Sequence, residues 1–414
     1  MPAIRYRSLT LGVTLVAATS VLYAQGSTAP PPAPWVADLD KPMTVEGSAT
    51  SSLPFLNQVH PDPRGKVTAA QAKAWEKRLR AIESFLEATP ILKSPRGFYP
   101  RPTGFVDWLG MGPYLDHPTT APLVGGVTVF AFDPRVVTVD KGVPKLKPGA
   151  DAPGLRVELN YIYLPGGEPW MHDSRGEFSR LPIDGYHEGF PIILDSLVVT
   201  RDGKLPFLPV SRERALTAFV AHHARARAET TTRIATARAA YEAALQPGAV
   251  AKRRATRDAE LAAIRDAKTR EVQRGKLEAW EKSDLEKLRK AANPDLDKDP
   301  GYTVLRALKD AEHQLATMTP AARARPAWLA RPTHDFEAGF FVHLVEDGQG
   351  DALVEIDPQY FDPEKPRDTP RIAWIRNLQK HAQAGSWGAN ARALLVLFQQ
   401  VDWRRFADTF LEAR

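Results

Sequence analysis

Two histidines and a group of carboxylates lie close together in the sequence between Gly166 and Gly189. The side chains of this stretch that could do chemistry are those of Glu168, His172, Asp173, Glu177, Asp184, His187 and Glu188. Imidazole nitrogens and carboxylate oxygens are ligands of zinc and related divalent metals, so the candidate metal ligands are His172, Asp173 and His187. The same groups can accept and donate protons, and the candidate catalytic residues are therefore His172, His187 and Glu188.

The spacing of these residues is equally compatible with an ordinary surface loop. His172 and His187 lie 15 residues apart, and the chain contains no HExxH motif that would fix a metal on one helix face. Residues 166–189 show no hydrophobic periodicity, which predicts a long surface loop, and such loops are polar by default. No cofactor is indicated anywhere in the chain.

The motifs that the chain lacks narrow the classes of protein it can belong to. It has 414 residues and no cysteine, which excludes disulfides, thiolate metal sites and cysteine nucleophiles. It also lacks Gly-x-Ser-x-Gly, Ser-x-x-Lys, P-loop and Gly-x-Gly-x-x-Gly motifs. This argues against the standard serine hydrolases, penicillin-binding enzymes, ATPases and dinucleotide enzymes, although a hydrolase with widely separated active residues stays open.

The first 24 residues have the order of a secretory signal peptide. Arg5 and Arg7 precede a largely apolar run of 14 residues from Leu9 to Leu22, and small residues follow around Ala24. A transmembrane helix needs about 20 apolar residues, so this run is too short to be one. We expect cleavage near Ala24, a periplasmic or extracellular location, and no transmembrane segment in the mature chain.

The elements that would position the candidate site alternate between helix and strand patterns. After a Pro- and Ser-rich tether at 25–66, Thr68 is an N-cap, and apolar residues at helical spacing predict a helix that ends before Thr89-Pro90. Strand patterns occupy residues 127–132, 135–139, 155–163, 190–200, 340–345 and 353–356. In 155–163 the alternation predicts that one face carries Leu155, Val157, Leu159, Tyr161 and Tyr163. We expect an ordered loop at 94–122 and helices at 303–318, 371–381 and 389–413.

A long helical stretch separates these patterns. Ser211 is an N-cap, and a weak heptad seam follows, formed by Leu216, Val220, His223, Arg227, Thr230, Ile234, Ala237, Tyr241 and Ala244. Gln246-Pro247-Gly248 breaks the helix, and a second helical run ends at Asn293-Pro294. We interpret residues 211–292 as a long antiparallel, coiled-coil-like hairpin.

The basic character of the chain resides in this helical stretch. Residues 211–292 contain 19 Arg and Lys against 11 Asp and Glu, whereas the whole chain is only +6. A basic helical arm could bind a protein partner or a second copy of itself, or it could simply be a solvated scaffold. Nucleic acid is an unlikely target for an exported chain whose basic residues are not interleaved with aromatic ones.

Together these patterns predict an α+β fold with an antiparallel or mixed sheet body packed by helices. We expect this body to comprise residues 67–210 and 300–414, with 211–292 inserted as a projecting hairpin. Two sequential domains are the alternative arrangement. For function we expect a non-enzymatic binding or assembly protein acting through the hairpin, and the alternative is a secreted hydrolase or metal-dependent enzyme using residues 166–189.

Overall fold

The structure is a computed structural model, and it describes residues 33, 35–39, 41, 43–61, 66–163, 171–172, 177–296, 302–331, 342–362, 364–378 and 388–413. The chain divides into two compact units. The first unit comprises Met1–Val210, Pro326–Leu329 and Val345–Arg414, and the second comprises Ser211–Arg325 and Ala330–Leu344. Helices and a mixed sheet occur together, which confirms the predicted α+β class.

Within the described residues the first unit contains two sheets and a ribbon. Across the large sheet the strands are β1 Leu56–Gln58, β2 Tyr99–Trp108, β3 Leu123–Phe132, β6 Gly154–Leu159, β15 Ile372–Arg376, β11 Ser196–Thr200, β10 Phe190–Ile193 and β9 Ile183–His187. The pair β1–β2 is parallel and the other neighbours are antiparallel. The second sheet contains β12 Phe207–Pro209, β14 Asp351–Ile356, β8 Glu177–Leu181, β7 Met171–His172 and β13 Trp328–Leu329. The ribbon pairs β4 Val137–Asp140 with β5 Val143–Leu146.

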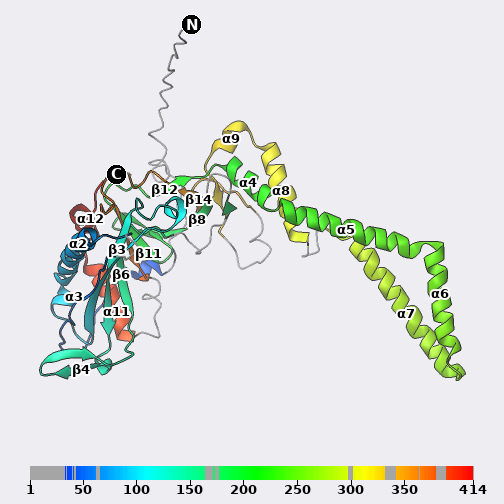
Figure 1. Ribbon diagram of the computed structural model, residues 1–414, viewed down its shortest axis with the longest axis horizontal. Coiled ribbons are helices and arrows are strands. Elements are labelled where there is room, and N and C mark those ends of the chain that lie inside the picture. The colour runs from blue at the N-terminus through cyan, green and yellow to red at the C-terminus, as the bar shows by residue number, and fades with distance from the viewer. Residues whose placement is uncertain are drawn as a thin grey trace, which may run out of the picture. The chain divides into compact units, whose positions relative to one another are not determined.

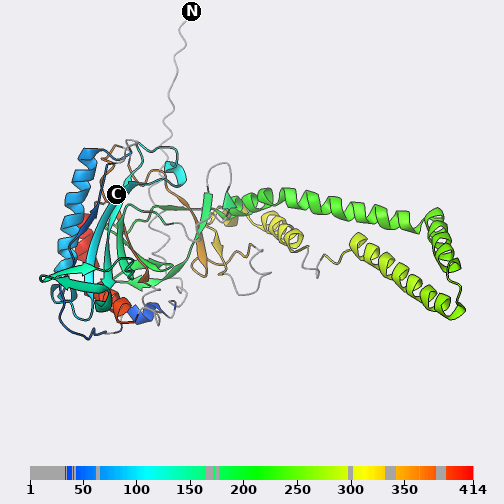
Figure 2. The same cartoon turned by 60° about the horizontal axis from the view of Figure 1, so that its bottom comes forward.

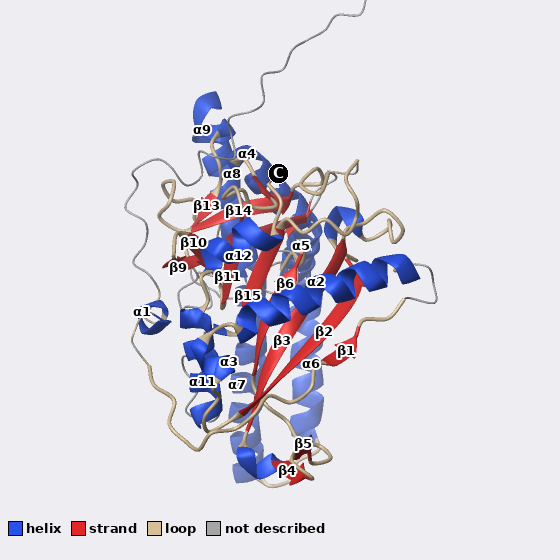
Figure 3. Cartoon of the chain, turned by 90° about the vertical axis from the view of Figure 1, so that its left-hand side faces the viewer, coloured by secondary structure: helices blue, strands red, loops and turns tan. Residues whose placement is uncertain are grey.

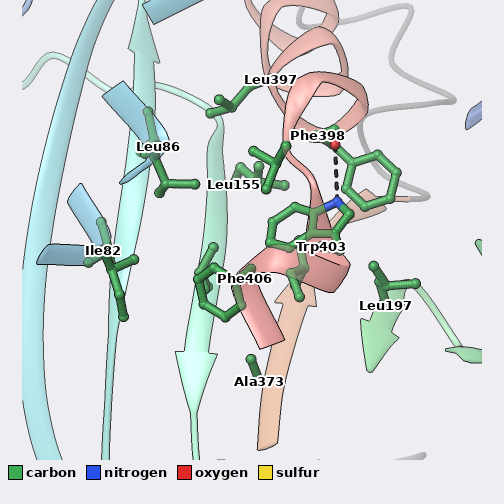
Figure 4. Close-up of a cluster of buried hydrophobic side chains, with 14 of the residues drawn as sticks. Ile82, Leu86, Leu155, Leu197, Ala373, Leu397, Phe398, Trp403 and Phe406 are labelled. Carbon is green, nitrogen blue, oxygen red and sulfur yellow. Dashed lines mark hydrogen bonds between the residues drawn. The ribbon is translucent and has the colours of Figure 1, made fainter. Parts of the chain in front are cut away.

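Helices cover one face of the large sheet (Figure 3). The helical segments of this unit are α1 Val36–Leu39, α2 Ala69–Glu87, α3 Pro90–Lys93, η1 Gly112–Tyr114, η2 Pro134–Val136, α11 Gly388–Gln400 and α12 Trp403–Phe410. Apolar residues of α2, α11 and α12 meet the sheet in one buried cluster, in which the Trp403 indole N–H donates to the Phe398 carbonyl (Figure 4). The start of α2 is as predicted, because the Thr68 hydroxyl accepts from the Gln71 N–H.

The other face of the large sheet meets a second buried cluster that includes residues of the second sheet. Alternation along β15 shows how the faces divide: Ala373 and Ile375 belong to the helix-covered cluster, whereas Ile372 and Trp374 belong to the opposite one. The first strands of the sheet, β1, β2, β3 and β6, present polar and aromatic side chains on that same opposite face, where they line a groove.

The predicted strand 155–163 ends earlier than expected. Asn160 has a φ of 56°, in the left-handed region, and its buried side chain bonds to backbone groups of Leu123, Thr369 and Arg371. Leu159 is therefore the last residue of β6. Tyr161 and Tyr163 lie beyond this break and pack with the opposite cluster, so the prediction that they share a face with Leu155 is wrong.

The predicted ordered loop at 94–122 contains the ten-residue strand β2. Pro100 and Pro102 argued against a strand, since proline removes a ladder donor. The Leu53 N–H donates to the Pro100 carbonyl, so Pro100 directs its carbonyl and its ring nitrogen away from β3. Pro102 points the same way by the period of two, and β1 pairs only with Thr103–Phe105. Neither proline therefore costs a bond between β2 and β3.

Four further predictions are corrected by the structure. Residues 372–376 of the helix expected at 371–381 instead form the strand β15, whose sequence IAWIR is buried between β6 and β11. Residues 166–189 do not form one long loop, because β7, β8 and β9 lie within them. The helix expected at 389–413 is divided where Asp402 caps α12. The strand expected at 340–345 is not found in its described residues, 342–345, whereas residues 340 and 341 lie outside the described part of the chain.

The described part of the second unit is mainly helical. It contains α4 Arg212–His222, α5 Ala224–Leu245, α6 Pro247–Ala262, α7 Ala267–Ala292, α8 Thr303–Thr317 and α9 Pro320–Ala324. Ser211 caps α4 as predicted, and α5 ends at the predicted Gln246-Pro247 break. From His223 onward, the seam positions are half-buried on α5, which packs against α7. Among the helices of the described chain, none combines the length and apolar character needed to cross a membrane.

The long two-armed hairpin is not shown by these helices. The second helical run is divided, and α5, α6 and α7 follow three sides of a triangle (Figures 1 and 2). The Asp266 carboxylate accepts from the Thr269 N–H at 2.6 Å, which begins α7 as a new helix. The Arg270 guanidinium also donates to the Ile264 carbonyl, which satisfies an acceptor in the turn between the helices.

Candidate ligand-binding groove

His187 and Glu188, two of the sequence-predicted site residues, lie at the end of β9 beside the C-terminal helices. The His187 ring centroid is 4.7 Å from that of Phe398. The Glu188 carboxylate accepts from the Trp403 N–H at 3.2 Å, at the first turn of α12, where a negative charge and an acceptor are both favourable. Both residues thus contribute to the packing of the C-terminal helices.

The other two predicted ligands are less fully placed. His172 ends β7 in the second sheet, whereas His187 lies in β9 of the large sheet. The His172 side chain and all of Asp173 lie outside the described residues. Among the residues that the structure does describe, no group of three or more His, Asp and Glu side chains could hold a metal ion. The metal and catalytic roles of His172, Asp173, His187 and Glu188 stay predictions.

A larger concentration of polar groups lies on the groove face of the large sheet. Strand register assembles it, since cross-strand partners share a face. One row across β1, β2, β3, β6 and β15 consists of Leu56, Thr103, Thr128, Arg156 and Arg376. The neighbouring rows bring in Arg101 opposite Phe130 and Glu158 opposite Gly126. Apart from Gly126, these residues line a groove with a volume of about 640 Å³.

Gly126 and Gly154 lie in the strands beneath this groove, and neither position has room for a side chain. A Cβ on Gly126 would lie 2.4 Å from the Val157 carbonyl oxygen and 3.2 Å from the Phe105 ring. A Cβ on Gly154 would lie 2.8 Å from the Thr128 methyl group. The strands can therefore approach here, and the ring of Phe105 can lie against the sheet, only because these positions carry no side chain.

Glu158 joins two arginines at the inner end of the groove. Its side chain is only 5% exposed, and its carboxylate lies 3.0 Å from Arg376 and 3.8 Å from Arg156. The Arg376 guanidinium also lies over the rings of Tyr163, at 4.7 Å, and Tyr161, at 5.7 Å. Burial lowers the pKa of Arg376, but the charge and hydrogen bond of Glu158 outweigh it, so the net pKa is raised.

Several donors on this face have no acceptor in the described part of the chain. They are Arg101 Nε, Thr103 Oγ, Arg376 Nε and Trp374 Nε1, each buried from solvent. Thr103 is 7% exposed, and its register position places it on the groove floor between Leu56 and Thr128. An unmet buried donor costs about 1–3 kcal/mol. Four of them on one face, three of which belong to residues that line the groove, call for a partner beyond the described residues, such as a ligand or water.

The groove was not predicted from the sequence, and the reasons can be identified. Arg101 and Thr103 lie in a stretch interpreted as a loop because of its prolines, and Arg376 lies in a stretch interpreted as a helix. The signal available was the face of each strand opposite the apolar one. Thr128 and Phe130 share that face in one strand, and Arg156 and Glu158 share it in the next. A solvated face was the simpler interpretation of that alternation.

The second unit contains a comparable charge cluster. Glu281 on α7 pairs with Arg253 at 3.1 Å and Arg257 at 3.3 Å, both on α6. Arg253 also donates to the Ala244 carbonyl at the end of α5. The cluster thus joins the three helices of the triangle, and it borders a cavity of 440 Å³.

No protein-family model matches the chain, and no curated protein or solved structure matches it significantly.

Proposed function

We propose that this chain is a non-enzymatic binding protein and that the groove on the large sheet is its ligand site. The observation that carries the proposal is the pair Arg101 and Thr103, whose buried Nε and hydroxyl have no acceptor among the described residues. A ligand oxygen would satisfy both donors and remove their desolvation cost. The groove volume of 640 Å³ also lies within the roughly 300–1,000 Å³ range of small-molecule pockets.

Binding accounts for the groove better than catalysis does. Its buried carboxylate, Glu158, is held in ion pairs with two arginines and is poorly placed to act as a base. Apart from the exposed Asp151, the charged groups left are arginines, and Arg101 and Thr103 are donors held by a strand. Rigid donors next to aromatic walls are the usual composition of a binding pocket. We infer that the ligand carries an oxyanion.

Calorimetric titration of the full mature chain with short and long carboxylates tests this proposal. We expect one saturable site, and we expect Arg101→Gln to weaken binding by roughly 10- to 100-fold, the value of a hydrogen bond to a charged group. Arg392→Gln is the matched control, because Arg392 is an exposed arginine of the same unit that does not line the groove. Equal binding by both variants would overturn the assignment of the site.

A second candidate function is association through residues 211–292, with a protein partner or a second copy. The observation that favours it is the exposure of large apolar side chains on α7, where Trp280 is 66% and Val272 is 54% exposed. Such residues are often contact points in interfaces. The half-buried seam of α5 is a weaker candidate surface, because α5 already packs on α7.

Light scattering over a range of concentrations tests this second function. Association through α7 predicts an average mass that rises with concentration for the wild type and stays at the monomer value for Trp280→Ala. Leu245→Ala is a matched control on α5, since Leu245 is also 49% exposed. A wild-type mass that stays monomeric at all concentrations would rule out self-association and leave only a partner of another kind.

Export remains part of the proposal. The expected leader, residues 1–24, lies outside the described residues. Intact mass measurement of protein recovered from the periplasm or the medium should give the mass of a chain that begins near Gln25. A full-length mass in the cytoplasmic fraction would contradict export.

A further inference from the structure

We infer that the groove takes an amphipathic monocarboxylate, with its carboxylate on Arg101 and Thr103 and its apolar chain on the aromatic end of the groove. This inference rests on the proposed binding function and adds the chemical class and the orientation of the ligand. It follows from three properties of the groove: the geometry of its donors, its charge, and the arrangement of its apolar walls.

The donor geometry fits a carboxylate. Arg101 and Thr103 are two residues apart on β2 and therefore point to the same face of the sheet. The Nε edge of a guanidinium presents two parallel N–H groups that match the two oxygens of a carboxylate. The hydroxyl of Thr103 lies one pleat further along and supplies a third donor.

The charged residues that line the groove leave one positive charge for a ligand to neutralise. The groove is lined by Arg101, Arg156 and Arg376 against Glu158 and Asp151. Glu158 already pairs with Arg376 and Arg156. Arg101 forms no ion pair among the described residues, so it is the cation for which a ligand would compensate. A monoanion balances it, whereas a dianion would leave an excess charge at a half-buried site.

The apolar end begins beside the donors. Phe130 is the cross-strand partner of Arg101, and Phe132 follows on the same face, with the two ring centroids 6.1 Å apart. These rings pack with Leu146 and Ala150 around a buried cluster that contains Phe132 and Ala152. All five of these apolar residues also line the groove together with Arg101. A chain attached to the carboxylate therefore has a continuous apolar wall to follow.

Calorimetric titration of the full mature chain with acetate, butyrate, hexanoate and octanoate tests this inference. Burial of a methylene contributes about 0.8 kcal/mol, so we expect the dissociation constant to fall about fourfold per added methylene. Octanol, which lacks the charge, should bind at least tenfold more weakly than octanoate. Arg101→Lys keeps the charge without the fork and should lie between the wild type and Arg101→Gln.

Phe130→Leu separates the two ends of the ligand. It should weaken octanoate several-fold and leave butyrate nearly unchanged, with amide exchange of β2 and β3 as the check that the sheet is intact. If butyrate and octanoate bind equally and Arg101→Gln still weakens both, the amphipathic ligand is excluded and the binding function stands. If no carboxylate binds, both proposals fail, and water is then the partner of the unmet donors.

Discussion

The two units each contain a glutamate held between two arginines, but the surroundings of the two clusters differ. Glu158 is 5% exposed and lies on the floor of a sheet, whereas Glu281 is 20% exposed and lies between helices. Arg253, one of the two arginines that pair with Glu281, also donates to the Ala244 carbonyl at the end of α5. Arg376 instead has a buried Nε without an acceptor in the described chain.

This difference separates a structural cluster from a candidate binding site. In the helical unit the charges join α6 to α7, and Glu281 and both of its arginines are partly exposed, so solvent weakens each pair. On the sheet the carboxylate of Glu158 is buried although Arg156 is half exposed, and strand register fixes the positions of all three residues. Arg101 and Arg376 each keep a buried Nε–H group without an acceptor in the described chain, so part of their desolvation cost is not offset by hydrogen bonds. This pattern is expected where a ligand completes the network.

The largest effect should follow removal of the buried carboxylate. Glu158→Gln leaves Arg376 without its counter-charge, and we expect a loss of roughly 3–5 kcal/mol in the free energy of unfolding of the first unit. Glu281→Gln is the matched change in the second unit and should cost about 1 kcal/mol or less. Because the units need not unfold together, peptide-resolved hydrogen exchange is the suitable measurement. Equal costs would remove the distinction between the clusters.

Two glycine substitutions should change stability in opposite directions. Gly126→Ala places a Cβ 2.4 Å from the Val157 carbonyl oxygen and should destabilise the sheet by about 1–3 kcal/mol. Gly275→Ala, in the interior of α7, meets nothing within 4 Å and should stabilise that helix by about 1 kcal/mol. The same exchange measurement reports both. A neutral Gly126→Ala would mean that the strands at the groove can relax.

The smallest effect concerns pH and the helical unit alone. His223 lies at the junction of α4 and α5, and burial, followed by the neighbouring His222, lowers its pKa below 6.5. The unfolded chain then binds the proton more readily, so this contribution to stability is present above pH 6.5 and is lost as the pH falls through the folded pKa. Thermal unfolding of His223→Gln should show a weaker decline below pH 6.5, by less than about 1 kcal/mol. An unchanged decline would point to other groups.

Local chemistry made the helix boundaries predictable. Thr68, Ser211 and the Gln246-Pro247 break act through their own neighbours, and the structure places helix ends at each of them. The half-buried face of α5 could also be predicted, because helical periodicity is local, although a coiled coil is not shown. The start of α7 was missed, although Asp266 followed by Thr269 is a cap signal of the same kind.

The groove depends on information that is not local. Arg101 and Arg376 share a face only through the register of β2, β3, β6 and β15, which are separated by as many as 275 residues. β15 also resembles a helix in its apolar content until its pairing with β6 and β11 is known. For the same reason the polar side chains of these strands could not be distinguished from a solvated face.

Hydrogen exchange of the full mature chain with and without octanoate tests the central claim most directly, because it reports both units at once. The account predicts slower exchange in peptides from β2 and β3, no change in α5–α7, and loss of the effect in Arg101→Gln. Protection that appears in α5–α7 and is absent from β2 and β3 would contradict it, because the ligand would then bind the helical unit.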